Sequence, residues 1–133
     1  MVEITKKIGN NAGKIWTALN TYGPQNQSSL LKNTKLSLKD LHAGVGWLAR
    51  ENKIFKDGTT YKLGETNLTN KIGEDAGKIW RYLNSNNNID ISSISKVTEI
   101  KIQDAYSAMG WLAREDKIIG KKINPNKIEY RLK

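Results

Sequence analysis

The six residues GWLARE occur twice in this chain, at residues 46–51 and again at residues 110–115. The same offset of 64 residues aligns AGKIW at residues 12–16 with AGKIW at residues 76–80. Close to half of the positions aligned in this way are identical. Similarity at a fixed spacing is typical of a repeated structural unit. We therefore predict two units, residues 1–64 and residues 65–133.

The residues before GWLARE predict two helices in each copy. Ile8, Ala12, Ile15 and Leu19 recur at helical spacing, which predicts a first helix over about residues 10–20 with Trp16 in the core; Trp80 is its counterpart. A short second helix follows, for which the sequence offers serine caps at Ser28 or Ser29 and at Ser92 or Ser93. A tight turn is expected at residues 34–35 and 98–99.

GWLARE itself lies on a predicted third helix, which begins near Leu38 in copy one and near Ile102 in copy two. Ser37 and Asp40 form a variant of the capping box at its start. The apolar face of this helix is expected to contain Leu38, Leu41, Val45 and Leu48.

A hairpin closes each copy. Residues 54–56 and 60–63 flank Asp57-Gly58, a strong two-residue turn signal, and residues 118–123 and 127–132 flank a longer turn at 124–126. The alternation at residues 89–91 adds a short strand in copy two. Two helices, a third helix after a tight turn and a hairpin are the order of a winged helix-turn-helix. We predict an α+β, mainly helical protein with two such domains in tandem.

The chain also resembles a small prokaryotic winged helix-turn-helix family of unknown function. The resemblance rests on IGNNAGKIWTAL and GWLARENKI in copy one, and on IGEDAGKIWRYL and GWLAREDKI in copy two. It covers nearly the whole chain and implies the fold. It implies no activity and no functional residue.

Composition narrows the classes of function. The net charge is +9, shared by both halves, because residues 1–66 carry 10 basic and 5 acidic groups and residues 67–133 carry 12 and 8. A basic surface attracts polyanions, although a lysine-rich solvated surface is the ordinary alternative. Apolar runs are too short for a membrane span, the N-terminus lacks a secretory signal, and cysteine is absent. We expect a cytoplasmic protein with no membrane partner.

Catalytic and cofactor motifs are not convincing. Residues 9–15 resemble a phosphate loop, but the glycines are one residue too close, and Ile15 replaces the Ser or Thr that binds Mg²⁺. His42 is the single histidine and its counterpart is Tyr106, so neither a zinc site nor a Ser-His-Asp site is expected. We predict a protein that is not an enzyme and binds neither a cofactor nor a metal.

The outward face of the third helix and the hairpins supply the candidate nucleic-acid contacts. In a helix-turn-helix, the N-terminal part of this helix reads the major groove. The predicted contacts are Lys39, Arg50, Lys56, Gln103, Arg114, Lys121, Lys122 and Lys127. Asp40 and Asp104 at the edges of this face would repel phosphate, and Ala43 and Ser107 offer little base recognition.

Four residues of the repeated motif predict a protein interface instead. Trp47 and Trp111 point away from their own apolar faces, and Gly46 and Gly110 beside them permit close packing of a helix. The other repeat, a second chain, the preceding segment or nucleic acid could cover them. Our first hypothesis is double-stranded DNA binding by a transcriptional regulator or chromatin-type accessory protein. The alternative is a protein-protein interaction module, with a partner protein or a homodimer, that uses this Trp/Gly face without DNA.

Overall fold

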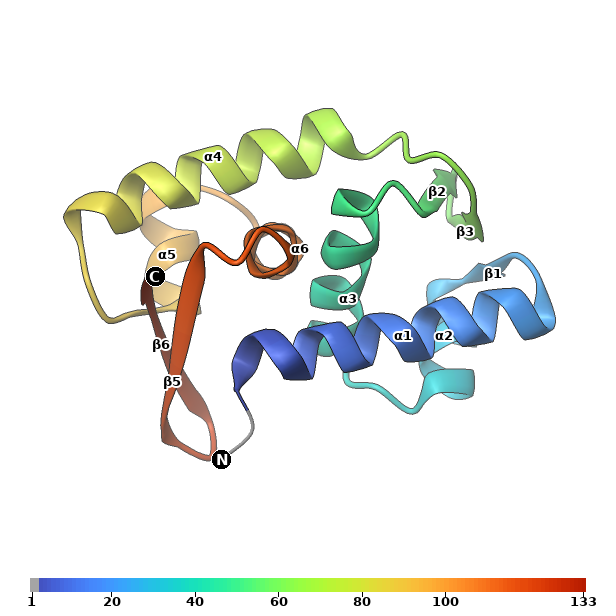
Figure 1. The fold of residues 1–133 in the computed structure, drawn as a ribbon, viewed down its shortest axis with the longest axis horizontal. Coiled ribbons are helices and arrows are strands. Elements are labelled where there is room, and N and C mark those ends of the chain that lie inside the picture. The colour runs from blue at the N-terminus through green and yellow to red at the C-terminus, as the bar shows by residue number, and fades with distance from the viewer. Residues whose placement is uncertain (1–2) are drawn as a thin grey trace.

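The computed structural model describes residues 3–133 and shows one succession of elements twice (Figure 1). The first half contains α1 (Ile4–Tyr22), β1 (Gln25–Asn26), α2 (Gln27–Thr34), α3 (Leu38–Arg50), β2 (Ile54–Asp57) and β3 (Thr60–Leu63). The second half contains α4 (Thr69–Ser85), β4 (Ile89–Asp90), α5 (Ile91–Thr98), α6 (Ile102–Arg114), β5 (Ile118–Asn124) and β6 (Lys127–Leu132). The predicted order of three helices and a hairpin is confirmed in both copies.

Each half has a small antiparallel sheet of three strands, in the orders β1-β3-β2 and β4-β6-β5. The expected strand at residues 89–91 exists as β4, but Ile91 already begins α5. Its counterpart β1 has no apolar alternation and was not predicted. In the first hairpin Asp57 pairs with Thr60, so the turn is Gly58-Thr59, one residue later than predicted. The second hairpin is longer and carries an irregularity between Lys122 and Asn124.

The caps of the second helices differ from the prediction. The side-chain oxygens of Asn26 and Asp90 accept hydrogen bonds from the backbone N–H groups of Ser29 (2.9 Å) and Ser93 (3.2 Å). The predicted serine caps were therefore wrong, because each helix begins directly after the short strand that carries the capping residue. The short strand and the second helix of each unit are thus joined without a loop.

The third helices begin where predicted. Lys35 has φ 58° and Glu99 has φ 60°, which gives the tight turn before each helix. The Ser37 hydroxyl accepts a hydrogen bond from the Asp40 N–H at 3.3 Å, as the capping-box pattern predicted. Leu41, Val45 and Leu48 are buried, but Leu38 is 45% exposed. The placement of Leu38 in the core was wrong, since the first turn of the helix extends past the core.

The first helices cross from one half of the molecule to the other (Figure 1). α1 begins at Ile4 rather than near residue 10, and its first turns contact β5, where a Cβ on Gly120 would lie 2.7 Å from Ile4 Cγ1. Ile8 belongs to the hydrophobic core of the second half, and Ile72 of α4 belongs to the core of the first. α1 is longer at its N-terminus than predicted because the apolar residues of its first turns, Ile4 and Ile8, pack against the second repeat.

The tryptophans of the first helices are not core residues. Trp16 is 40% exposed and Trp80 is 38% exposed, which corrects the prediction that both are buried. Ile15 and Ile79, one position earlier, are fully buried instead. Trp16 lies at the edge of its apolar stripe and lines a shallow surface groove together with Gly13 and Trp47.

Candidate nucleic-acid interface

The third helices α3 and α6 pack face to face across the centre of the molecule, with their backbones in contact (Figure 1). A Cβ on Gly46 would lie 1.7 Å from the carbonyl oxygen of Ser107, and a Cβ on Gly110 would lie 1.8 Å from that of Ala43. No side chain fits at such distances, so glycine is required at both positions. The contacts are reciprocal, as in a two-fold symmetric dimer, but both partners belong to one chain.

Trp47 and Trp111 cover the ends of this contact. Trp47 lies against Gly9, where a Cβ would meet the indole ring at 3.0 Å, and Trp111 lies against Gly73, where the distance is 3.5 Å. Both indoles are half-buried and pack against the cores of both halves. Gly46, Trp47, Gly110 and Trp111, which we expected at a protein interface, thus lie between the two repeats of the same chain.

The arginines of GWLARE also connect the repeats. Arg50 Nε lies 3.1 Å from a carboxylate oxygen of Glu115, and Arg114 Nε lies 3.0 Å from one of Glu51. Each guanidinium stands over the tryptophan of the other copy, with Arg50 5.6 Å from the Trp111 ring centre and Arg114 5.9 Å from that of Trp47. These arginines therefore have partners within the protein. The repeated glutamates, which were not selected from the sequence, supply them.

Lys39 and Gln103 lie in the first turns of α3 and α6 and remain exposed. The structure brings Lys39 close to the second hairpin, because Lys39 and Lys127 line the same cavity. Arg50 and Arg114 occupy the last turns of the two third helices, at the other end from Lys39 and Gln103. The predicted contacts on the third helices therefore lie at opposite ends of these helices.

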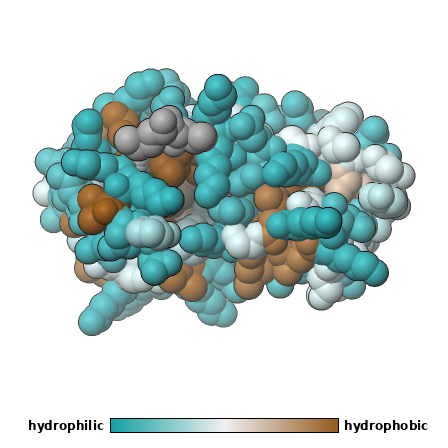
Figure 2. Space-filling model, turned by 90° about the horizontal axis from the view of Figure 1, so that it is seen from below, coloured by the Kyte–Doolittle hydropathy of each residue, from teal (hydrophilic) through white to brown (hydrophobic). Residues whose placement is uncertain are grey.

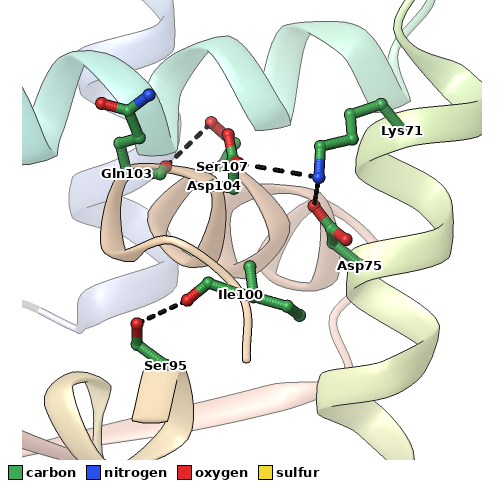
Figure 3. A network of polar contacts seen from close by, with 7 residues as sticks. All are labelled: Lys71, Asp75, Ser95, Ile100, Gln103, Asp104 and Ser107. Atoms are coloured by element: carbon green, nitrogen blue, oxygen red, sulfur yellow. Dashed lines mark hydrogen bonds and ion pairs between the residues drawn. The ribbon is translucent and has the colours of Figure 1, made fainter. Parts of the chain in front are cut away.

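Charged groups around the start of α6 form a network (Figure 3). Lys71 Nζ on α4 lies 2.9 Å from a carboxylate oxygen of Asp75 and 3.6 Å from one of Asp104. The hydrogen bond to Asp75 raises the pKa of Lys71. The four-residue spacing of Lys71 and Asp75 is a detectable helical ion-pair signal, whereas the contact with Asp104 needs the tertiary structure.

Two buried polar side chains have an atom without a hydrogen-bond partner in the described residues. His42 is 8% exposed, and its Nε2 has no hydrogen-bond partner among residues 3–133. Burial lowers the pKa of His42, and Asp104 partly opposes this effect. The Nδ2 atom of Asn11, the counterpart of Asp75, also lacks a partner in the described chain. The neutral form of His42 is therefore favoured in the folded protein.

The hairpins expose the remaining predicted contacts. Lys56, Lys121, Lys122 and Lys127 are all exposed. Lys56 stands 5.4 Å from the ring centre of Tyr61, and Lys127 lies 3.7 Å from a carboxylate oxygen of Glu129. Lys121 and Lys122 form no ion pair within residues 3–133. Their ammonium groups are thus available to an external anion.

Other kinds of site find little support in the described residues. Residues 3–133 contain no group of three or more acidic or histidine side chains arranged to hold a metal ion. Over the same residues, no helix combines the length and the apolar character needed to cross a bilayer.

Three helices followed by a hairpin, repeated and packed through the third helices, define a pair of winged helix-turn-helix domains. The chain belongs to the family described as "Winged helix-turn-helix domain (DUF2582)", whose model matches residues 3–64 and again residues 67–130. The recognition of two tandem copies is thereby confirmed.

One curated relative is the uncharacterized protein MJ1608 of Methanocaldococcus jannaschii. It is 43% identical to this chain over 54 residues, which cover 36% of this chain and 71% of the relative. The relative is therefore about as long as one repeat. No solved structure matches the chain.

Proposed function

We propose that this protein binds double-stranded DNA without catalysing a reaction, and that it contacts the phosphate backbone through its second hairpin. The observation that carries the proposal is the pair of exposed lysines Lys121 and Lys122 on β5, which lack ion-pair partners within residues 3–133. They belong to the wing of a winged helix-turn-helix domain in a chain of net charge +9. We extend the proposal to a role in transcription or in chromatin organisation.

The packing of the third helices determines the proposed mode of binding. Ala43, Gly46, Ser107 and Gly110 are buried between α3 and α6, so the middle of each helix is not available to base edges. Phosphate contacts hold a protein on the duplex without reading its sequence. The face shown in Figure 2 is mainly hydrophilic, with its apolar residues in separate patches. Binding with little sequence preference is therefore the expected mode.

The alternative function, a protein-interaction module that uses the Trp/Gly face, receives less support. Within this chain the other repeat already covers Gly46 and Gly110, and the arginine–glutamate pairs close the edges of the contact. An external partner would have to separate the repeats to reach that face. A stoichiometric protein partner that binds while the repeats stay packed would need another surface.

The test is binding of a random-sequence duplex, followed by fluorescence anisotropy at about 50 and about 200 mM salt. The logarithm of the affinity should fall linearly with the logarithm of the salt concentration, with a slope of about −0.9 for each phosphate that the protein neutralises. The double substitution Lys121→Gln/Lys122→Gln should weaken binding and reduce the size of this slope by about 2. Absence of binding at the lower salt concentration would overturn the proposal.

A matched control distinguishes a contact of the second wing with DNA from the effect of the protein's net positive charge. Lys14 on α1 and Lys78 on α4 are exposed lysines outside the wings, and Lys14→Gln/Lys78→Gln removes the same charge. This variant should keep most of the affinity and the salt slope. Equally weakened binding in the two double variants would contradict a contact through the second wing.

A further inference from the structure

A cavity of about 140 Å³ lies between the two repeats, beside the turn and strand β6 of the second hairpin. Elements of both repeats enclose it: α1 and the start of α3 from the first, and α5, α6 and β6 from the second. Lys7, Lys39, Tyr106, Met109, Lys127 and Tyr130 are among the side chains that line it. No residue of the repeated GWLARE motif takes part.

The walls of this cavity combine apolar and hydrogen-bonding groups. Ile8, Met109 and Ile128 supply an apolar lining, and Lys7 and Lys39, which also line the cavity, form no ion pair in residues 3–133. The Tyr130 side chain is only 5% exposed, and its hydroxyl forms no hydrogen bond within the described residues. The hydroxyl is not among the fully buried polar atoms, so it remains accessible to a ligand. Burial raises the pKa of Tyr130, so the phenol stays protonated and can donate.

The size and charge of the cavity indicate the class of ligand. An apolar cavity of roughly 150 Å³ holds one benzene molecule, so this cavity suits a ligand of about one ring. Three lysines and two aspartates, Asp40 and Asp90, line it, which leaves a small positive balance. The Asp90 carboxylate is already engaged as the cap of α5. A ligand with a single negative charge fits this balance better than a phosphate with two.

We propose that this cavity binds a small organic carboxylate with one ring or a comparable apolar group. The apolar part lies between Met109 and Ile128, and the carboxylate accepts hydrogen bonds from the Tyr130 hydroxyl and from Lys7 or Lys39. Lys39 and Lys127 line this cavity and are also predicted nucleic-acid contacts, but carboxylate binding can be tested without nucleic acid.

The equivalent region of the other half is built differently. There Lys71, the counterpart of Lys7, is held by Asp75 and Asp104 (Figure 3). The first hairpin is shorter, and the groove beside Tyr61 is lined by residues of the first repeat alone. The proposal therefore predicts one bound carboxylate per chain, although the fold is repeated.

The experiment is a titration of the full chain with benzoate, followed by amide chemical shifts in NMR. Saturable 1:1 binding is expected, with shifts at residues 126–130 and near Lys7 and none around Tyr61. Benzamide, which has the same shape without the charge, should bind at least 10-fold more weakly. Absence of saturation at millimolar benzoate, or equal binding of benzamide, would overturn the proposal.

Tyr130→Phe removes only the unpaired hydroxyl and should weaken benzoate binding about 10-fold, the range for a hydrogen bond to a charged group. Tyr61→Phe is the matched control at the equivalent position and should leave the affinity unchanged. Lys7→Gln, at an exposed position, should weaken binding without affecting the fold. Equal affinities of the Tyr130→Phe and Tyr61→Phe variants would contradict the assigned site.

Discussion

The two repeats share their motif but differ at the places where each meets the other. The first unit has a short hairpin, with strands of four residues each, whereas β5 and β6 of the second have seven and six. At equivalent positions the first unit has His42 and Asn11 where the second has Tyr106 and Asp75. The central contact between α3 and α6 is nevertheless reciprocal. The comparison shows that the shared motif maintains the interface while the residues around it are free to diverge.

The largest expected effect comes from the backbone contact that both repeats share. Gly46→Ala places a methyl group 1.7 Å from the Ser107 carbonyl oxygen, so the helices must separate. We expect the free energy of unfolding to fall by about 3 kcal/mol or more, at the upper end of overpacking effects, as measured by urea denaturation.

Gly13→Ala is the control for that substitution, because the Cβ position at Gly13 has no atom within 4 Å. The same chemical change should there raise the free energy of unfolding by up to about 1 kcal/mol, through helix propensity alone. A similar effect of the two substitutions would show that the contact between α3 and α6 does not constrain the fold.

A second difference between the repeats should appear as a dependence on pH. Burial lowers the pKa of His42 below its usual value of 6.5, so the unfolded chain takes up a proton before the folded chain does. The stabilisation is complete above pH 6.5 and should decline as the pH falls below it, by at most about 1.4 kcal/mol per pH unit for one proton. Urea denaturation at several pH values measures this decline.

His42→Gln, which cannot titrate, should remove that component of the pH dependence. His42 is the single histidine of the chain, so no other imidazole contributes in this range. An unchanged pH profile in the variant would indicate that the imidazole is protonated equally in both states.

The two arginine–glutamate pairs test whether the interface is energetically symmetric. Both pairs are partly exposed, with Arg50 and Arg114 side chains at 45% and 46%, so each should contribute about 0.5 kcal/mol. Double-mutant cycles on Arg50/Glu115 and on Arg114/Glu51 measure these coupling energies. Coupling energies that differ by more than about 1 kcal/mol would show that the two ion pairs contribute unequally despite their reciprocal geometry.

A further difference between the repeats concerns the glycines beneath the two tryptophans. Gly73→Ala brings a methyl group to an ordinary distance of 3.5 Å from Trp111, whereas Gly9→Ala brings it to 3.0 Å from Trp47. Higher helix propensity should raise the free energy of unfolding of both variants by about 1 kcal/mol. Only Gly73→Ala should keep most of this gain, because the methyl group at position 9 crowds Trp47. Thermal denaturation of the two variants should therefore rank Gly73→Ala above Gly9→Ala.

Sequence reasoning was most successful where a local signal decides the structure. The third helices, the tight turns at Lys35 and Glu99 and both hairpins were predicted, because caps, turn residues and apolar spacing act over a few residues. The errors share another cause. Trp16 was assigned to the core and the first turns of α1 were omitted, since the surroundings of both depend on the other repeat.

The candidate sites show the same division. The exposed wing lysines could be selected from the sequence, because lysine side chains are rarely buried wherever the hairpin is placed. The cavity that joins Lys7 and Lys39 to Tyr130 could not, since its residues come from distant segments of the chain. The charge pattern of Lys71 and Asp75 was visible as a helical pair, but its extension to Asp104 was not.

The repeat, the order of elements and the winged helix-turn-helix class can all be inferred from the sequence, because periodicity and turn chemistry are local properties of the chain. What faces GWLARE depends instead on how distant segments pack. The absence of a side chain at Gly46 and Gly110 permits close packing of any helix. The sequence does not identify the helix that packs there. In the folded chain that helix is the third helix of the other repeat, since burying both apolar and small-residue faces against each other leaves neither exposed to water.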